Sequence, residues 1–174
     1  IHVVLLELVI DPTCSIILER QPAEKNIMNR TPRAPHENII TFTSLIKSII
    51  QGLVIFSAAF GTYFMFLKQY PNSADIARTL GLTIIFISNI LLVQVNSSKT
   101  ELFVDSFMKL INDKFILAVN IAIIISLLII IYSPIHALLK LAPLSCYQMI
   151  MAIGVSCLAV LWYEFVKLYK LYFR

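Results

Sequence analysis

The sequence has little charge: Lys, Arg, Asp and Glu make up 14% of its 174 residues, whereas apolar side chains make up 59%. Soluble domains carry about 25% charged and about 45–50% apolar residues. The mean hydropathy of +0.84 reflects the same excess. Because so much apolar surface is unfavourable in water, we expect it to face lipid, and the composition predicts an integral membrane protein.

Motifs that carry chemistry are also scarce. The three cysteines have no CxxC spacing, the three histidines are isolated, and no glycine-rich phosphate loop or Ser/His/Asp set is present. Cys14 stands alone without a Cys-Pro-Cys pattern, which disfavours a soft-metal site. The basic residues are dispersed without a recognisable binding module, so nucleic acid is not an expected partner. We expect no cofactor in this chain, and any chemistry to lie in its apolar segments or outside this chain.

Apolar runs alternate with polar, proline-containing segments. They predict an all-α membrane protein, a bundle of about five transmembrane helices, with spans at about 1–17, 44–67, 79–95, 114–132 and 147–168 and cytoplasmic loops at about 18–43 and 96–113. The first span is short and contains Glu7, Asp11 and Pro12, so we expect it to be truncated and discontinuous. In the second loop, charges recur every four residues opposite apolar positions, which predicts an interfacial helix.

Basic residues are divided unequally between the two sides of this arrangement. Only Lys68, Arg78 and Lys140 of the fourteen Lys and Arg fall on one side, and the other eleven fall on the side of the loops and the C-terminus. The positive-inside rule then predicts a multi-pass protein of the cell membrane with a cytoplasmic C-terminus.

Glu7 and Asp11 are the candidate ion ligands. Their spacing of four places them on one side of a helix, and each acid costs about 2.5–3.5 kcal/mol at the centre of a membrane helix. Pro12 has no N–H for the Leu8 backbone carbonyl, so that oxygen is a further candidate, and Asn89 is a candidate neutral ligand. Such oxygen ligands suit Ca²⁺, Mg²⁺ or Mn²⁺. The alternative is that this stretch lies outside the membrane with both acids solvated, which its apolar flanks disfavour.

One loop string carries a family resemblance. The string Pro22-Ala-Glu-Lys-Asn-Ile27-Met28-Asn-Arg30-Thr-Pro32-Arg33 resembles the cytoplasmic loop after the sixth transmembrane helix of P-type cation-transporting ATPases, whose pattern is Pro, four variable residues, Ile-Met, any, Arg, any, Pro-Arg. The similarity continues to the end of the chain, at Asn96 and Ser98, Asn112-Asp-Lys114, Tyr132-Ser-Pro134, Ala142-Pro-Leu-Ser145, Glu164 and Lys167.

The resemblance implies that the five spans are transmembrane helices six to ten of a calcium-pump-like ATPase. It places Asp11 on the family's ion-binding aspartate and Glu7 on the position one turn earlier, which is often asparagine. Two departures leave calcium selectivity open: Ile10 replaces a threonine, and Pro12 follows the aspartate directly. The carboxylate expected in the eighth helix is replaced by Asn89 or Ile90, depending on register.

The family's phosphorylation and hinge motifs Asp-Lys-Thr-Gly, Thr-Gly-Glu and Gly-Asp-Gly-x-Asn-Asp do not occur in this sequence. The resemblance therefore implies that the use of Mg-ATP belongs to upstream cytoplasmic domains, that upstream helices and the bilayer are partners, and that this chain is inactive alone. Two alternatives remain, a stand-alone small membrane protein (a secondary transporter or structural subunit) and a truncated pump remnant. The upstream genomic sequence distinguishes them.

Overall fold

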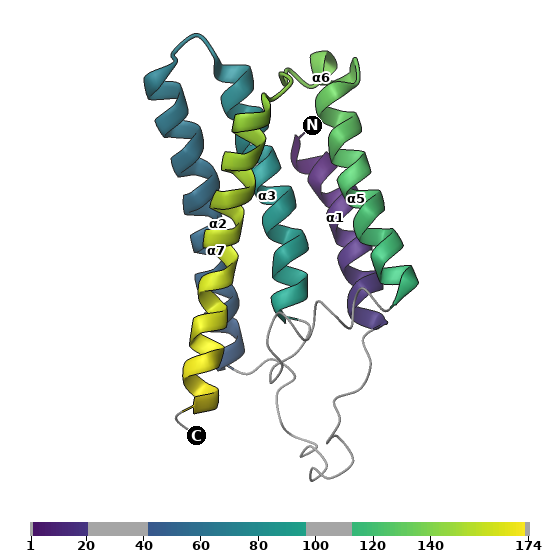
Figure 1. Ribbon diagram of the computed structural model, residues 1–174, viewed down its shortest axis with the longest axis vertical. Coiled ribbons are helices and arrows are strands. Elements are labelled where there is room, and N and C mark those ends of the chain that lie inside the picture. The colour runs from purple at the N-terminus through teal and green to yellow at the C-terminus, as the bar shows by residue number, and fades with distance from the viewer. Residues whose placement is uncertain (1, 21–41, 97–112, 173–174) are drawn as a thin grey trace.

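The computed structural model describes residues 2–20, 42–96 and 113–172, and the protein in these ranges is helical with short connections and no strand. The helices are α1 (His2–Glu19), α2 (Phe42–Gln69), α3 (Ala74–Asn96), α5 (Lys114–Tyr132), α6 (Ile135–Leu138) and α7 (Cys146–Tyr172) (Figure 1). The predicted all-α membrane bundle is confirmed. The expected interfacial helix and most of the first expected loop lie outside the described residues.

Four helices are long and apolar enough to cross a membrane: α2, α3, α5 and the Cys146–Leu168 part of α7. The shortest, α5, has 19 residues, and at 1.5 Å per residue it spans about 28 Å, close to the ~30 Å hydrocarbon core. A helix in lipid satisfies its own backbone hydrogen bonds, which is why these apolar runs are helical. The 18-residue α1 is not among the four, since it carries Glu7, Asp11 and Glu19.

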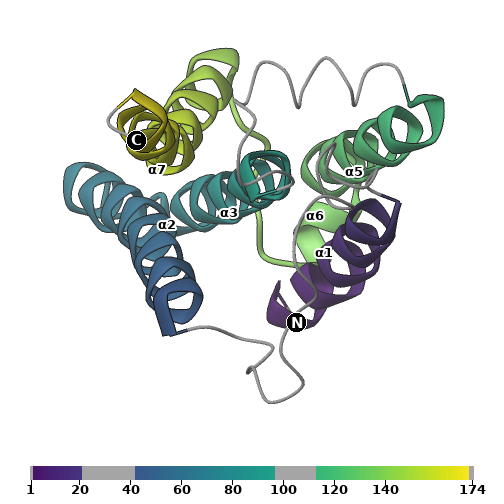
Figure 2. The same cartoon turned by 90° about the horizontal axis from the view of Figure 1, so that it is seen from below.

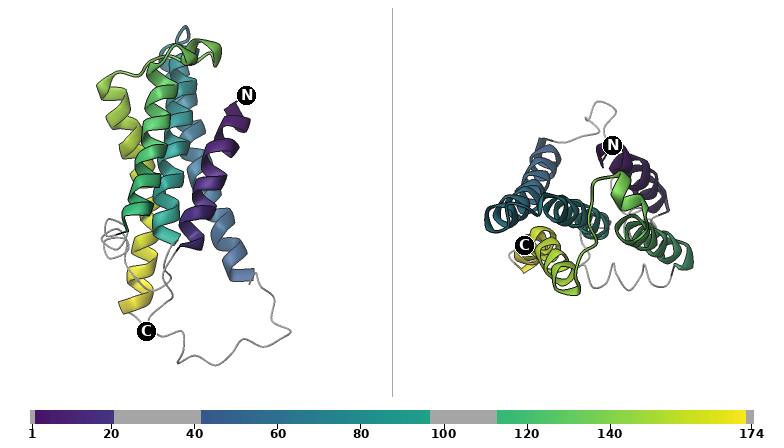
Figure 3. Two further views of the ribbon diagram at one scale, coloured as in Figure 1. Left: turned by 90° about the vertical axis from the view of Figure 1, so that its right-hand side faces the viewer. Right: turned by 90° about the horizontal axis from the view of Figure 1, so that it is seen from above.

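Helix α3 is the centre of the bundle. It packs against α1, α2, α5 and α7, with α2 and α7 on one side of it and α1 and α5 on the other (Figures 2 and 3). Its Leu80, Ile84 and Phe86 are fully buried. Helices α2, α5 and α7 instead each leave an apolar side uncovered, as lipid-facing helices do.

The ends of α5 and α7 are capped by local side chains. At the start of α5, Asp113 Oδ1 accepts a hydrogen bond of 3.0 Å from the Phe115 amide, and this bond, helped by Arg20, lowers the pKa of the Asp113 carboxyl. At the start of α7, Ser145 and Gln148 form reciprocal bonds between side chain and backbone, which is a capping box. Both helices therefore begin where their sequences supply an oxygen acceptor.

The loop between α5 and α7 is attached to two helices. The Thr79 hydroxyl of α3 accepts a hydrogen bond of 2.9 Å from the Ala142 amide and donates to the Asp75 carbonyl. The Tyr132 hydroxyl at the end of α5 donates to the Leu144 carbonyl. These bonds satisfy loop backbone groups at the membrane boundary and hold the ends of α3, α5 and α7 together.

The predicted discontinuity of the first span is not observed: the α1 backbone is helical from His2 to Glu19 without a break at Pro12. Proline removes one backbone hydrogen bond, but membrane helices tolerate it where neighbouring helices support the chain. In α1 that support comes from packing against α3 and α5. The chain therefore presents its acidic residues on a continuous helix.

Polar contacts inside the bundle join α3 to its larger neighbours. Gln51 of α2 and Asn96 of α3 exchange two amide hydrogen bonds of 3.4 and 3.2 Å. Lys167 of α7, which is 6% exposed, donates to the carbonyl of Val95 at the end of α3 and forms a 2.9 Å ion pair with Glu164. The lysine thereby satisfies one of the carbonyls that a helix leaves unpaired at its C-terminal end.

Replacing Lys167 with Met removes the ion pair while keeping most of the side-chain volume. We expect a loss of about 3–5 kcal/mol of stability, because Glu164 loses a buried partner. Thermal unfolding of the purified membrane protein measures it. Lys68→Met, at an exposed site on the opposite end, is the matched control, and adding Glu164→Gln to Lys167→Met restores part of the loss. Equal stability of Lys167→Met and Lys68→Met contradicts this account.

Candidate functional site

Helix α1 has a packed side and an uncovered side. Leu6, Ile10, Cys14 and Ile17, at helical spacings of four, four and three, pack against the core shared with α3 and α5. Among the α1 side chains that the structure describes, the exposed ones are Val4, Glu7, Ser15, Ile16 and Glu19. The described helices of this chain therefore cover only one side of α1.

Glu7 lies on the uncovered side. Its side chain is exposed, at the edge of that side: it lies about 100° around the helix from the packed Leu6 and about 20° from the packed Cys14. It forms no ion pair with any described residue. The helix places it about 20 Å from Arg20 at the other end. In a hydrocarbon core a carboxylate requires a polar partner.

Asp11 follows one turn after Glu7 on the same continuous helix. The side chains of Asp11 and Leu8 lie outside the described part of the structure, while their backbone is helical. Since Pro12 lacks an N–H, the Leu8 carbonyl has no bond of the usual helical kind to position 12. The structure thus keeps the predicted spacing of Glu7, Leu8 and Asp11 along α1 without the expected unwinding.

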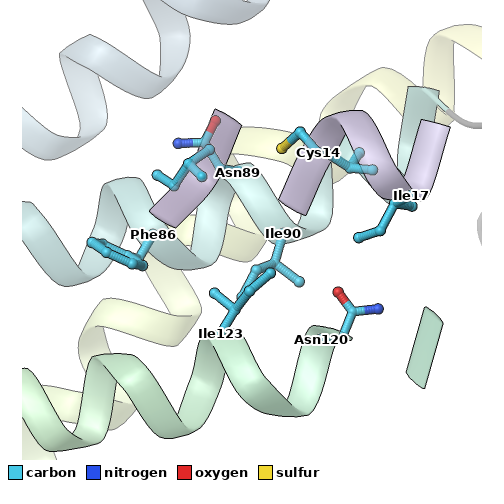
Figure 4. A pocket seen from close by; sticks show the side chains of 9 residues that line it. Cys14, Ile17, Phe86, Asn89, Ile90, Asn120 and Ile123 are labelled. Carbon is cyan, nitrogen blue, oxygen red and sulfur yellow. The ribbon is translucent and has the colours of Figure 1, made fainter. Parts of the chain in front are cut away.

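Asn89 lies in a small pocket where α1, α3 and α5 meet. The lining residues are Ile10, Cys14, Ile17, Phe86, Asn89, Ile90, Val93, Asn120 and Ile123 (Figure 4). The Asn89 amide nitrogen donates to the Ile85 carbonyl at 3.0 Å, within its own helix. Its carbonyl oxygen is the group left to serve as a ligand. The structure brings Asn89 to α1, but on the packed side, whereas Glu7 does not line this pocket.

Asn120 is a polar residue of this pocket that the sequence did not single out as a ligand. Its Oδ1 atom is buried and has no hydrogen-bond partner among the described residues. It sits in α5, where the other side chains are almost all apolar. A single amide side chain in an apolar run could have indicated a ligand from the sequence, but it equally predicts a hydrogen bond between helices.

The basic residues of the described helices gather at the two ends of the bundle. Arg20, Lys47, Lys114 and Lys167 lie toward the end that holds the C-terminus, and Lys68, Arg78 and Lys140 toward the end that holds the α2–α3 turn (Figure 1). Among the described residues, no three His, Cys, Asp or Glu side chains form a metal-binding group.

Comparison with known proteins adds the family. A search of curated proteins finds no match. The family profile described as the C-terminus of cation transporting ATPases matches residues 1–169. The match includes all of the described helices except the last three residues of α7, and it includes all of the candidate ligands. On that match, the chain belongs to the family formed by the C-terminal membrane region of cation-transporting ATPases.

Proposed function

We propose that this chain is the part of an ATP-driven pump that helps to coordinate the transported ion, with α1 as the ligand-bearing helix. Glu7 and Asp11 supply carboxylates, the Leu8 carbonyl is a third oxygen, and Asn89 is a neutral ligand from α3. The cargo is a divalent cation such as Ca²⁺, Mg²⁺ or Mn²⁺, since carboxylate and carbonyl oxygens suit these ions.

The observation that carries this proposal is the exposed carboxyl group of Glu7 within the apolar helix α1. A carboxylate facing lipid costs about 2.5–3.5 kcal/mol, and Glu7 lies at the edge of the packed side of α1, next to Ile10 and Cys14 on the helix surface. Helices from the upstream part of the pump, together with the ion, would cover the exposed side of α1. They would complete a site that the described helices leave open.

The rest of the cycle belongs to the parent protein. Cytoplasmic domains that use Mg-ATP would alternate the site between the two sides of the membrane, which requires an ion affinity that differs between two states. In that scheme α1 supplies ligands, and α2, α3, α5 and α7 form a supporting bundle.

The proposed orientation puts the α1 C-terminus, the α5 N-terminus and the end of α7 in the cytoplasm. In cells expressing a pump without other cysteines, Cys146 alone, or Asn72→Cys alone, should react with an impermeant maleimide from outside. Lys114→Cys should react only after permeabilisation. Asn72, Lys114 and Cys146 are all exposed, so failure to react is not due to burial. Labelling of Asn72→Cys and Lys114→Cys from the same side contradicts this orientation.

Replacing Asp11 with Asn in the intact pump keeps the size of the side chain and removes its negative charge. We expect ion-activated phosphorylation from ATP to be abolished, while phosphorylation from inorganic phosphate, which in this family proceeds from the ion-free state, survives. Both are measured as acid-stable incorporation of radioactive phosphate.

Asp75→Asn is the matched control for Asp11→Asn, because Asp75 is an exposed carboxylate at the start of α3, ion-paired to Arg78. It should leave both phosphorylation reactions unchanged. If Asp11→Asn retains normal ion activation, α1 does not supply an essential carboxylate at position 11, and the proposed ligand set is wrong.

A further inference from the structure

The end of α1 nearest Arg20 is attached to the start of α5. Arg20 Nε lies 3.1 Å from Asp113 Oδ2, and the Arg20 guanidinium lies over the Phe115 ring at 4.6 Å from its centroid. We call Arg20, Asp113 and Phe115 the Arg20–Asp113 clamp. It joins residues 93 positions apart in the sequence.

The two carboxylate oxygens of Asp113 accept hydrogen bonds from different donors. Oδ1 accepts the Phe115 amide and caps α5, and Oδ2 accepts Arg20. The Asp113 carbonyl also accepts the Leu117 amide, so the residue is held by the first turn of α5. The anchor for Arg20 is therefore part of a helix end and does not depend on a freely moving side chain.

Apolar packing continues directly from this clamp toward the membrane. Ile17 of α1 and Ile116 of α5 are 2% and 4% exposed and belong to one buried cluster with Val93 of α3, against which Cys14 packs. Arg20 sits one turn after Ile17, and Asp113 one turn before Ile116. The ion pair and the apolar cluster together fix this end of α1 against α5 and α3.

We propose that Arg20 and Asp113 are positioning residues for ion binding, because they set the position of α1 relative to the supporting bundle. This inference rests on the proposed role of α1 as the ligand-bearing helix. Arg20 is nine residues from Asp11, about 14 Å along a continuous helix. Movement at the clamp would therefore displace the ligands as well. Ligands that are free to shift bind an ion more weakly than ligands already held in place.

The test uses Arg20→Gln, Asp113→Asn and the double variant in the intact pump. Asn caps a helix about as well as Asp, so Asp113→Asn removes the ion pair and keeps the cap. We expect each single variant to raise the ion concentration for half-maximal phosphorylation about two- to fivefold, the range for a partly exposed ion pair. The double variant should resemble either single variant, because both changes remove the same contact.

A purely electrostatic effect on cation concentration predicts a different result. Removing the positive Arg20 would then strengthen ion binding and removing the negative Asp113 would weaken it, whereas loss of the clamp weakens binding in both. Lys114→Gln, at the exposed neighbour of Asp113, is the matched control and should not weaken ion binding. Opposite shifts in Arg20→Gln and Asp113→Asn, or additive shifts in the double variant, would overturn the inference.

A second measurement does not depend on ion binding. Cys14 is partly buried on the packed side of α1, so its rate of alkylation by N-ethylmaleimide, with all other cysteines replaced by serine, reports contact of α1 with the bundle. We expect a two- to fivefold faster reaction in Arg20→Gln and Asp113→Asn but not in Lys114→Gln. An unchanged alkylation rate would show that the Arg20–Asp113 clamp does not hold α1 against the bundle. A faster alkylation rate with unchanged ion affinity would show that the clamp has no role in ion binding. Failure of the proposed ligand set itself would appear separately, as ion activation retained in Asp11→Asn.

Discussion

The absence of hydrogen-bonding partners in the hydrocarbon core is the constraint on which this structure depends. Each helix forms its own backbone hydrogen bonds, and polar side chains within the spans form hydrogen bonds with backbone carbonyls or with other helices. Thr83 donates to the Thr79 carbonyl, and Ser156 of α7 donates to the carbonyls of Ile84 and Ala152. Because many of these contacts involve α3, the most buried helix is also the one to which the others are joined.

The same constraint gives α1 its special position. The other long helices can expose apolar side chains to lipid without cost, but α1 exposes Glu7, and lipid cannot solvate a carboxylate. Its packed side is already occupied by α3 and α5. Under the proposed function, further helices of the parent protein and the ion would cover the other side. The family match, to the C-terminus of cation transporting ATPases, supports that reading.

The proposed ion site lies on a helix that the described helices cover on one side, so its ligands need another means of being held in place. In this chain the apolar contacts of Ile17 and the pairing of Arg20 with Asp113 hold one end of α1, while α3 lies along its packed side. Asp113 remains ionised at neutral pH, since its bond from the Phe115 amide lowers its pKa. The ionised Asp113 contributes fully to stability at pH values above its ordinary pKa of about 3.9. This contribution is lost only as the pH falls through the lowered pKa of the folded state.

The sequence alone determined the all-helical membrane character, the family, and the positions of Glu7 and Asp11 one turn apart, because apolar runs and residue spacing act locally. The helix start at Lys114 is local in the same way, since Asp113 caps it. Only the tertiary structure decided that α3 is central and that α1 stays helical through Pro12. It also decided that Asn89 and Asn120 line the same pocket and that Arg20 forms an ion pair with Asp113. In lipid all apolar helix faces are nearly equivalent, so partners are selected by detailed packing and by a few polar contacts between residues far apart in the sequence, and no local pattern contains that information.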